Sequence, residues 1–340
     1  MPNVGSGKPR HSGRRSQGRR NTVLDDVLGV FNTGLLAPSL RLATPILLAA
    51  LGGLYTQQAG VLNIALEGNM LIGAFAGAAV AYATGNAWLG LLGAVLASML
   101  LAAVFGLFSI RLRADLVVAG IAINLLAAGA TLVLMQRFFD TKGNFSPGTR
   151  LPDVRLRFLA DVPVLGDLFQ RQNVLVYAGL LLVVTAHIVL YQTPFGLRVR
   201  SVGESPEAAA TAGIPVRRVQ FATVLISGAL CGMAGANLSL GYLSQFTANM
   251  TSGRGYIALA AQTFGNATPI GTALASLFFG FADALSVRLQ SRGQLAQYTQ
   301  FVLMIPYIAT ILALVLVARR RTLLGRRRAS VQVEKAEATI

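Results

Sequence analysis

The chain of 340 residues is 54% hydrophobic and only 12% charged, with a mean hydropathy of +0.60. Soluble domains carry about 25% charged residues, so this composition excludes an ordinary soluble domain. The formal charge is +16, but twelve of the 29 basic residues lie in two tails, 1–20 and 319–328, without interleaved aromatic residues. We interpret these tails as positive-inside anchors of a membrane protein and exclude a nucleic-acid surface.

The apolar residues stand in long runs, which predicts an all-α polytopic membrane protein. About ten segments are expected to cross or enter the membrane, and both termini are expected to be cytoplasmic. These segments are 22–38, 40–55, 71–84, 88–110, 114–136, 173–191, 219–243, 255–264, 270–287 and 298–317. Small residues are dense within them, which predicts close helix packing. We therefore expect a basic tail (1–21), a membrane domain (22–318) and a second basic tail (319–340).

Several of these segments depart from the length or composition of an ordinary span. Segment 22–38 is weakly apolar and predicts a short span or an interfacial helix. Segment 40–55 is shorter than the roughly 20 residues that a span requires, and segment 255–264 is shorter still. The number of true spans therefore stays open, and the polar stretches beside the short segments become the informative ones.

The first polar interruption contains Asn63, Glu67 and Asn69. Spacing i, i+4 would place Asn63 and Glu67 on one face of a helix. A carboxylate at bilayer depth costs roughly 2.5–3.5 kcal/mol on insertion scales, so it should face a cavity or a partner. Because transporters bind their substrates beside broken helices, these three residues are candidates for a solute path. The alternatives are a structural carboxylate that caps or pairs inside the bundle, or one near the cytoplasmic surface.

A second polar and aromatic stretch spans residues 245–256 and is expected near the outer face. This stretch is expected to contribute either to a substrate route, with Thr247, Asn249 and Tyr256 as candidates for contact with a solute, or to the docking of an external partner. An ordinary loop with a helix cap is the alternative. Further along the chain, Asp283 and Arg288 are interpreted as an internal pair or as an anchor at a helix end.

A polar island at residues 198–218 separates two long apolar segments. Ser205 can cap a short helix that starts at Pro206, and Gly213 can end it in the left-handed conformation. Glu204 and Glu207 lie at its N-terminal end, where the helix dipole favours negative charge. Arginines flank the island on both sides, which is typical of a cytoplasmic loop. The island is either a docking element or an ordinary solvated loop.

Four stretches together resemble the permease subunits of nucleoside ABC importers, which belong to the superfamily of branched-chain amino acid and simple-sugar permeases. They are LRLATPILLAALGGLYTQQAGVLNIALEGNMLIGAF (40–75), GESPEAAATAGI (203–214), ISGALCGMAGANLSLGYLSQFTANMTSGRGYIALAA (226–261) and FGFADALSVRLQ (279–290). In such permeases the second stretch is the cytoplasmic coupling helix, which seats in the ATP-binding subunit. The resemblance assigns this coupling role to Gly203, Glu204, Pro206, Glu207, Ala208, Ala209 and Gly213.

The resemblance implies that this chain is not an enzyme and binds no cofactor, and that ATP and Mg²⁺ belong to the ATP-binding subunit. It also implies a second homologous permease, an external lipid-anchored substrate-binding protein and a nucleoside substrate, with the chain in the bacterial cell membrane. A permease for simple sugars or branched-chain amino acids is the alternative within the superfamily. An ATP-independent channel or secondary transporter, with Glu67 and Asp283 as proton relays, is the alternative from another class.

Overall fold

The computed structural model describes residues 35–141, 143–154, 172–290, 304 and 308. In this part of the chain, seven helices are long and apolar enough to cross a membrane. They are α2 (Leu36–Gln58), α3 (Leu66–Thr84), α4 (Ala87–Gly106) continued by the π-helix η3 (Leu107–Arg111), α5 (Leu116–Phe139), α7 (Val174–Gln192), α10 (Val216–Ala236) continued by the π-helix η5 (Asn237–Tyr242), and α12 (Pro269–Gln290). The prediction of an all-α polytopic membrane protein is confirmed.

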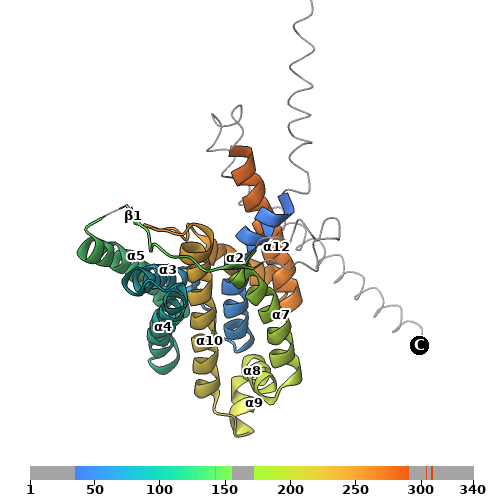
Figure 1. Cartoon of the computed structure of the whole chain (residues 1–340). Helices are drawn as coiled ribbons and strands as arrows, with labels where there is room; N and C mark the ends of the chain where they lie inside the picture. The colour runs from blue at the N-terminus through green and yellow to red at the C-terminus, as the bar shows by residue number, and fades with distance from the viewer. Residues whose placement is uncertain (1–34, 142, 155–171, 291–303, 305–307, 309–340) are drawn as a thin grey trace, which may run out of the picture.

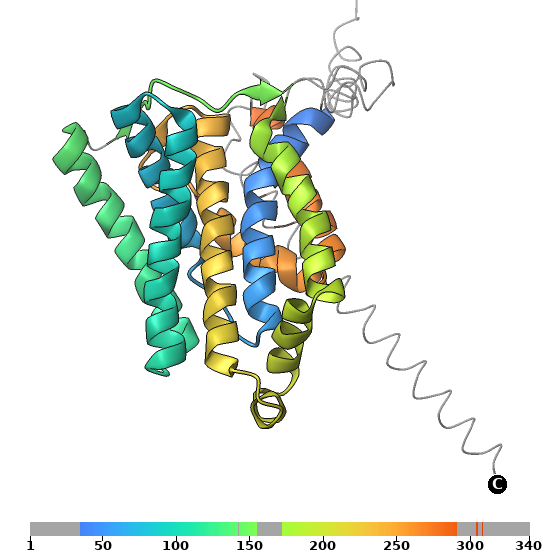
Figure 2. The same cartoon turned by 60° about the horizontal axis from the view of Figure 1, so that its bottom comes forward.

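Four of the long helices, α4, α10, α2 and α7, stand side by side in one layer (Figure 2). Helices α3 and α12, with the short α11 (Arg254–Phe264), pack behind this layer. At one edge, α5 contacts mainly α3. The small residues allow these helices to approach closely: a Cβ at Gly232 of α10 would overlap the backbone of α4 at Ala94. The close packing expected from the small residues is therefore present.

Two short helices, α8 (Pro194–Glu204) and α9 (Pro206–Thr211), project from one end of the bundle, which we call the α9 end (Figure 1). The opposite end carries two small antiparallel pairs, and we call it the strand end. Strand β1 (Asn144–Phe145) pairs with β4 (Phe246–Thr247), and β2 (Asp153–Val154) pairs with β3 (Gln172–Asn173). The polar island thus lies at the end opposite to β4, which belongs to the stretch 245–256 expected near the outer face.

Helix α2 is the central helix of the bundle and contacts α12, α10, α11 and α7. It is longer than segment 40–55, because Leu36 to Ser39 precede that segment in the same helix and the polar residues Thr56 to Gln58 continue it. Residues 36–38, predicted as the end of segment 22–38, therefore belong to α2. Pro45 lies inside it and is buried, a position tolerated where neighbouring helices enclose the backbone. A full-length helix therefore replaces the short segment expected here.

The first described helix, α2, begins at the strand end, and α12 leads back to that end. If both termini lie on the side of α9, one more crossing is required before Leu36 and one after Gln290. Segments 22–38 and 298–317 were predicted for these crossings. Both are wholly or largely outside the described residues, as are the two basic tails.

Candidate functional site

The α9 end presents a capped helix pair. The Thr193 hydroxyl accepts a hydrogen bond from the amide of Gly196 (3.2 Å), and the Ser205 hydroxyl accepts one from the amide of Ala208 (3.3 Å). Pro206 is the first residue of α9, and Gly213 ends the turn after it with φ +79°. The predicted short helix, its cap and its left-handed glycine are confirmed.

Helix α9 is anchored at one point and exposed elsewhere. Ala209 is buried in an apolar cluster with Val199, Val202 and Val219. The exposed predicted coupling residues are Glu204, Pro206, Glu207, Ala208 and Gly213. A small rigid surface therefore projects from the bundle, as a docking element requires.

We expect replacement of Ser205 by alanine to loosen α9 by about 1 kcal/mol, because the Ala208 amide loses its cap. Faster hydrogen exchange at the amides of residues 207–209 would report this change. Ser201→Ala is the matched control, since the Ser201 hydroxyl donates within α8 to the Arg198 carbonyl and caps no helix. Equal changes in the two variants would contradict the capping role.

The helix pair α8–α9 packs directly against residues 59–65, which connect α2 to α3 without a helix and which we call the break. Gly203 lies so close to this break that a Cβ there would overlap the carbonyl oxygen of Gln58. The side-chain amide of Gln220 donates from Nε2 to the Ala59 carbonyl (3.3 Å), and that of Gln58 donates from Nε2 to the Ala267 carbonyl (2.6 Å). The break therefore joins α8, α10 and the turn between α11 and α12.

Beyond the break, the chain rises from the α9 end to the start of α3 without forming a helix. The fully buried Asn63 holds this stretch: its Oδ1 accepts from the Ala65 amide (3.0 Å), and its Nδ2 donates to Ser227 Oγ (3.0 Å). Ser227 follows the start of α10 by eleven residues, or about 16 Å. The expectation that Asn63 and Glu67 share a helix face is wrong, because the Asn63 side chain bonds the local backbone and α3 begins only at Leu66.

Glu67 caps a different helix. Its carboxylate accepts hydrogen bonds from the amides of Gly253 (2.8 Å) and Gly255 (2.6 Å), at the N-terminus of α11. Its side chain is buried, and the bonds use the amides of the N-cap residue Gly253 and of Gly255 in the first turn, where a helix offers no acceptors. The structure thus shows the capping arrangement that was the alternative for this carboxylate. A role for Glu67 toward a solute stays a prediction.

This contact also corrects the depth of the second interruption. Glu67 lies seventeen residues before the end of α3 at the strand end, or about 26 Å. The stretch 245–256, which was expected near one face, is therefore not confined to the strand end. It descends from β4, where Phe246 packs against Phe75, to the level of Glu67.

A polar residue that the sequence analysis did not select joins these parts. Asn124 of α5 accepts from the Gly68 amide (2.8 Å) and donates to the Ile64 carbonyl (3.0 Å) and to the Tyr256 hydroxyl (3.1 Å). An asparagine inside an apolar span was the available signal. Asn124 thus connects α5, the start of α3 and α11.

The other predicted solute-path residues differ in their surroundings. Asn69 is fully buried, and neither polar atom of its side chain has a hydrogen-bond partner among the described residues. Thr247 is half-buried in β4, whereas Asn249 is exposed with φ +55°. Tyr256 is 49% exposed. Of the six, only Asn249 and Tyr256 present an exposed side chain.

A buried ion pair joins the start of α11 to α12. Arg254, the first residue of α11, pairs with Asp283 of α12 at 3.4 Å, and both side chains are largely buried. The prediction that paired Asp283 with Arg288 misassigned this contact, because residues five apart point to different sides of a helix. The Asp283 carboxylate compensates the positive charge of Arg254, which the helix dipole disfavours at the N-terminus of α11.

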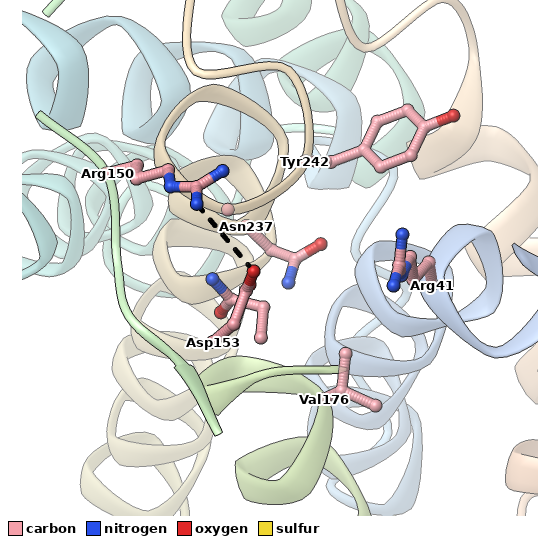
Figure 3. A pocket seen from close by; sticks show the side chains of 8 residues that line it. Arg41, Arg150, Asp153, Val176, Asn237 and Tyr242 are labelled. Atoms are coloured by element: carbon pink, nitrogen blue, oxygen red, sulfur yellow. Dashed lines mark ion pairs between the residues drawn. The ribbon is translucent and has the colours of Figure 1, made fainter. Parts of the chain in front are cut away.

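A separate pocket of about 130 Å³ opens at the strand end (Figure 3). Arg150 and Asp153 form an ion pair across it at 3.9 Å, and Arg41 donates from Nε to Gln172 Oε1 (3.0 Å). Asn237 lines it from η5. None of the predicted solute-path residues lines this pocket. Its volume is below the roughly 300 Å³ of sites that enclose a whole small molecule, so it suits a single side chain.

Comparison with known proteins gives a consistent result. The family described as "Branched-chain amino acid transport system / permease component" matches residues 35–325. The guanosine ABC transporter permease protein NupQ of Bacillus subtilis is 39% identical over 82% of this chain and 90% of its own. The putative glucose ABC transporter permease protein TsgC13 of Haloferax volcanii is 38% identical over 77% and 79% of the two chains. The nucleoside ABC transporter permease protein NupC of Lactococcus lactis is 34% identical over 83% and 91%. No solved structure matches the chain.

Proposed function

The chain belongs to the family of branched-chain amino acid transport system permease components, and we propose that it forms the translocation path for nucleosides in an ATP-binding-cassette importer. The observation that carries the substrate class is its similarity to NupQ and NupC, whose names specify guanosine and nucleosides, over most of both chains. TsgC13, of nearly equal identity to NupQ, supports glucose as the second candidate substrate.

The α9 end is proposed to dock to the ATP-binding subunit. Helix α9 is short, capped by Ser205 and anchored by the buried Ala209. A displacement of α9 by the partner subunit would therefore move α8 and α9 together. Gly203 transmits this displacement to the break between α2 and α3, because it lies against the backbone of Gln58. ATP and Mg²⁺ would be held by that partner subunit, which supplies the hydrolysis.

A second permease is proposed to cover the face formed by α5 and α11. The irregular residues 248–253 reach the depth of Glu67, where Asn249 and Ser252 are exposed. Irregular backbone at membrane depth is tolerated only where it is enclosed by protein or lines a water-filled cavity. A homologous subunit across this face would satisfy that requirement and would leave the solute path between the two chains.

The strand end is proposed to face outward, toward an external lipid-anchored protein that delivers the nucleoside. This orientation places the arginines beside α9 in the cytoplasm, as the positive-inside rule requires. It also places both termini in the cytoplasm if segments 22–38 and 298–317 cross the membrane.

The test is uptake of labelled guanosine by cells that express this chain together with its neighbouring transporter genes. We expect uptake that stops when ATP is depleted while the ion gradient is kept, and that unlabelled nucleosides block while glucose, ribose and leucine do not. Cells that carry the same genes without this chain are the control.

Competition by glucose alone would transfer the assignment to the second candidate, whereas competition by leucine alone would favour an amino acid permease. Uptake that continues without ATP would refute the importer and favour a channel or a secondary transporter.

A further inference from the structure

Tyr256 is an exposed aromatic residue that lies between the two ends of the bundle, far from both. It lies in the first turn of α11, next to Gly255, whose amide bonds Glu67. Its hydroxyl accepts a hydrogen bond from Asn124, which follows the start of α5 by eight residues, or about 12 Å. About half of the tyrosine side chain is nevertheless uncovered. An aromatic ring and a hydroxyl group are therefore presented together within the thickness of a bilayer.

The hydroxyl proton of Tyr256 has no acceptor among the described residues, since the recorded bond uses the oxygen as acceptor. Lipid tails supply no hydrogen-bond acceptor. The neighbouring exposed groups are also polar: Asn249 and Ser252 lie on the irregular segment that leads into α11. This combination is unsuited to a lipid-facing surface and suited to one that meets a polar solute.

We propose that Tyr256 contacts the translocated nucleoside, with its ring stacked on the base and its hydroxyl donating to an oxygen of the base or ribose. This inference rests on the proposed function, because it requires a solute with a planar base. A tyrosine provides both contacts from one side chain, and stacking on an aromatic ring tolerates different bases.

Asn124 acts as the positioning residue. Its Oδ1 is bonded to the Gly68 amide, and its Nδ2 is shared between the Ile64 carbonyl and Tyr256. These bonds fix the amide against the start of α3, so the donor that holds the tyrosine oxygen cannot rotate away. The bond from Asn124 uses the tyrosine oxygen as an acceptor and leaves its proton available to the solute.

The experiment measures KM and maximal rate of ATP-dependent guanosine uptake for variants of the full transporter, normalised to the amount of assembled complex. Tyr256→Leu is expected to raise KM by tenfold or more, because it removes the stacking surface. Tyr256→Phe keeps the ring and is expected to raise KM by about two- to tenfold, the effect of one hydrogen bond. Phe108→Leu is the matched control, because Phe108 is exposed to a similar extent (46%) on η3 and should leave KM unchanged.

The role of Asn124 is tested by a double-mutant cycle. Asn124→Ala is expected to raise KM in the wild-type background and to have no further effect on KM in Tyr256→Phe, because the hydroxyl that it positions is already absent. A purely structural asparagine would lower the amount of assembled transporter in both backgrounds and would change KM by the same factor in each.

The outcomes separate the two levels of the proposal. ATP-dependent guanosine uptake by the wild type with an unchanged KM in Tyr256→Leu overturns this inference alone. Loss of the second permease from the purified complex of that variant, with KM unchanged, assigns Tyr256 to the subunit interface instead. If the wild type takes up only glucose, the nucleoside function and this inference are both overturned, because no base is available to stack.

Discussion

Replacement of Glu67 by alanine is expected to destabilise the protein by about 3–5 kcal/mol and to abolish uptake. The variant leaves the amides of Gly253 and Gly255 without the carboxylate that accepts both of them in a buried site. Hydrogen bonds to a charged group contribute about 1.5–3 kcal/mol each, and buried donors without acceptors add their desolvation penalty. Thermal unfolding of the transporter purified in detergent measures this loss.

Asp115→Ala is a matched control for this variant. The carboxylate of Asp115 also accepts two amide bonds, from Val117 and Val118 at 2.9 Å, but it lies exposed at the start of α5. Removal of an exposed cap costs about 1 kcal/mol. The difference between the stability losses of the two variants therefore measures the effect of burying the capping carboxylate.

Glu67→Gln gives a second measurement, because its amide oxygen keeps one acceptor for α11. We expect it to lie between the wild type and the alanine variant in stability. A glutamine variant that unfolds with wild-type stability but transports nothing would contradict a purely capping role and would return Glu67 to the solute path or to proton transfer.

Replacement of Gly203 by alanine is expected to reduce ATP-dependent uptake by about 5- to 150-fold while the chain still inserts and assembles. The new Cβ would overlap the Gln58 carbonyl oxygen, so the end of α8 must move away from the break between α2 and α3. Such overpacking costs about 1–3 kcal/mol, which corresponds to that range of rates if the displaced contact transmits movement from α9. Uptake and ATP hydrolysis by the reconstituted transporter are the measurements, and we expect hydrolysis to persist without uptake.

The control is Gly129→Ala on α5, where a Cβ meets no atom within 4 Å. Because the obstacle at Gly203 is a backbone oxygen, shortening the Gln58 side chain should not rescue the variant. Wild-type uptake by Gly203→Ala would show that this contact does not couple α9 to the membrane helices.

Local signals account for what the sequence predicted well. Long apolar runs located the spans, since the bilayer requires about 20 apolar residues in a helix whatever its neighbours are. The cap at Ser205, the proline at position 206 and the left-handed Gly213 set the bounds of α9 within a few residues. Each depends on atoms close in the chain.

Partners distant in the chain explain the errors. Glu67 and Gly255 are 188 residues apart in sequence, and Asn124 and Tyr256 are 132 apart. No periodicity specifies which amide a buried carboxylate will meet, so the depth of residues 245–256 and the partner of Asp283 were misjudged. Asn124 was overlooked for the same reason, since a single polar residue in a span shows that a partner is needed but not which one.

The sequence by itself therefore determined that the chain is a helical membrane protein with a capped helix projecting between two spans, and its motifs indicated the family. Only the tertiary structure decided that α3 and α11 both begin at depth, joined by Glu67, and that Gly203 rests on the break before α3. Hydrophobic runs and helix caps act over one or two turns of chain. Buried polar groups must find acceptors and donors wherever packing places them, so their pairing is settled when the helices assemble.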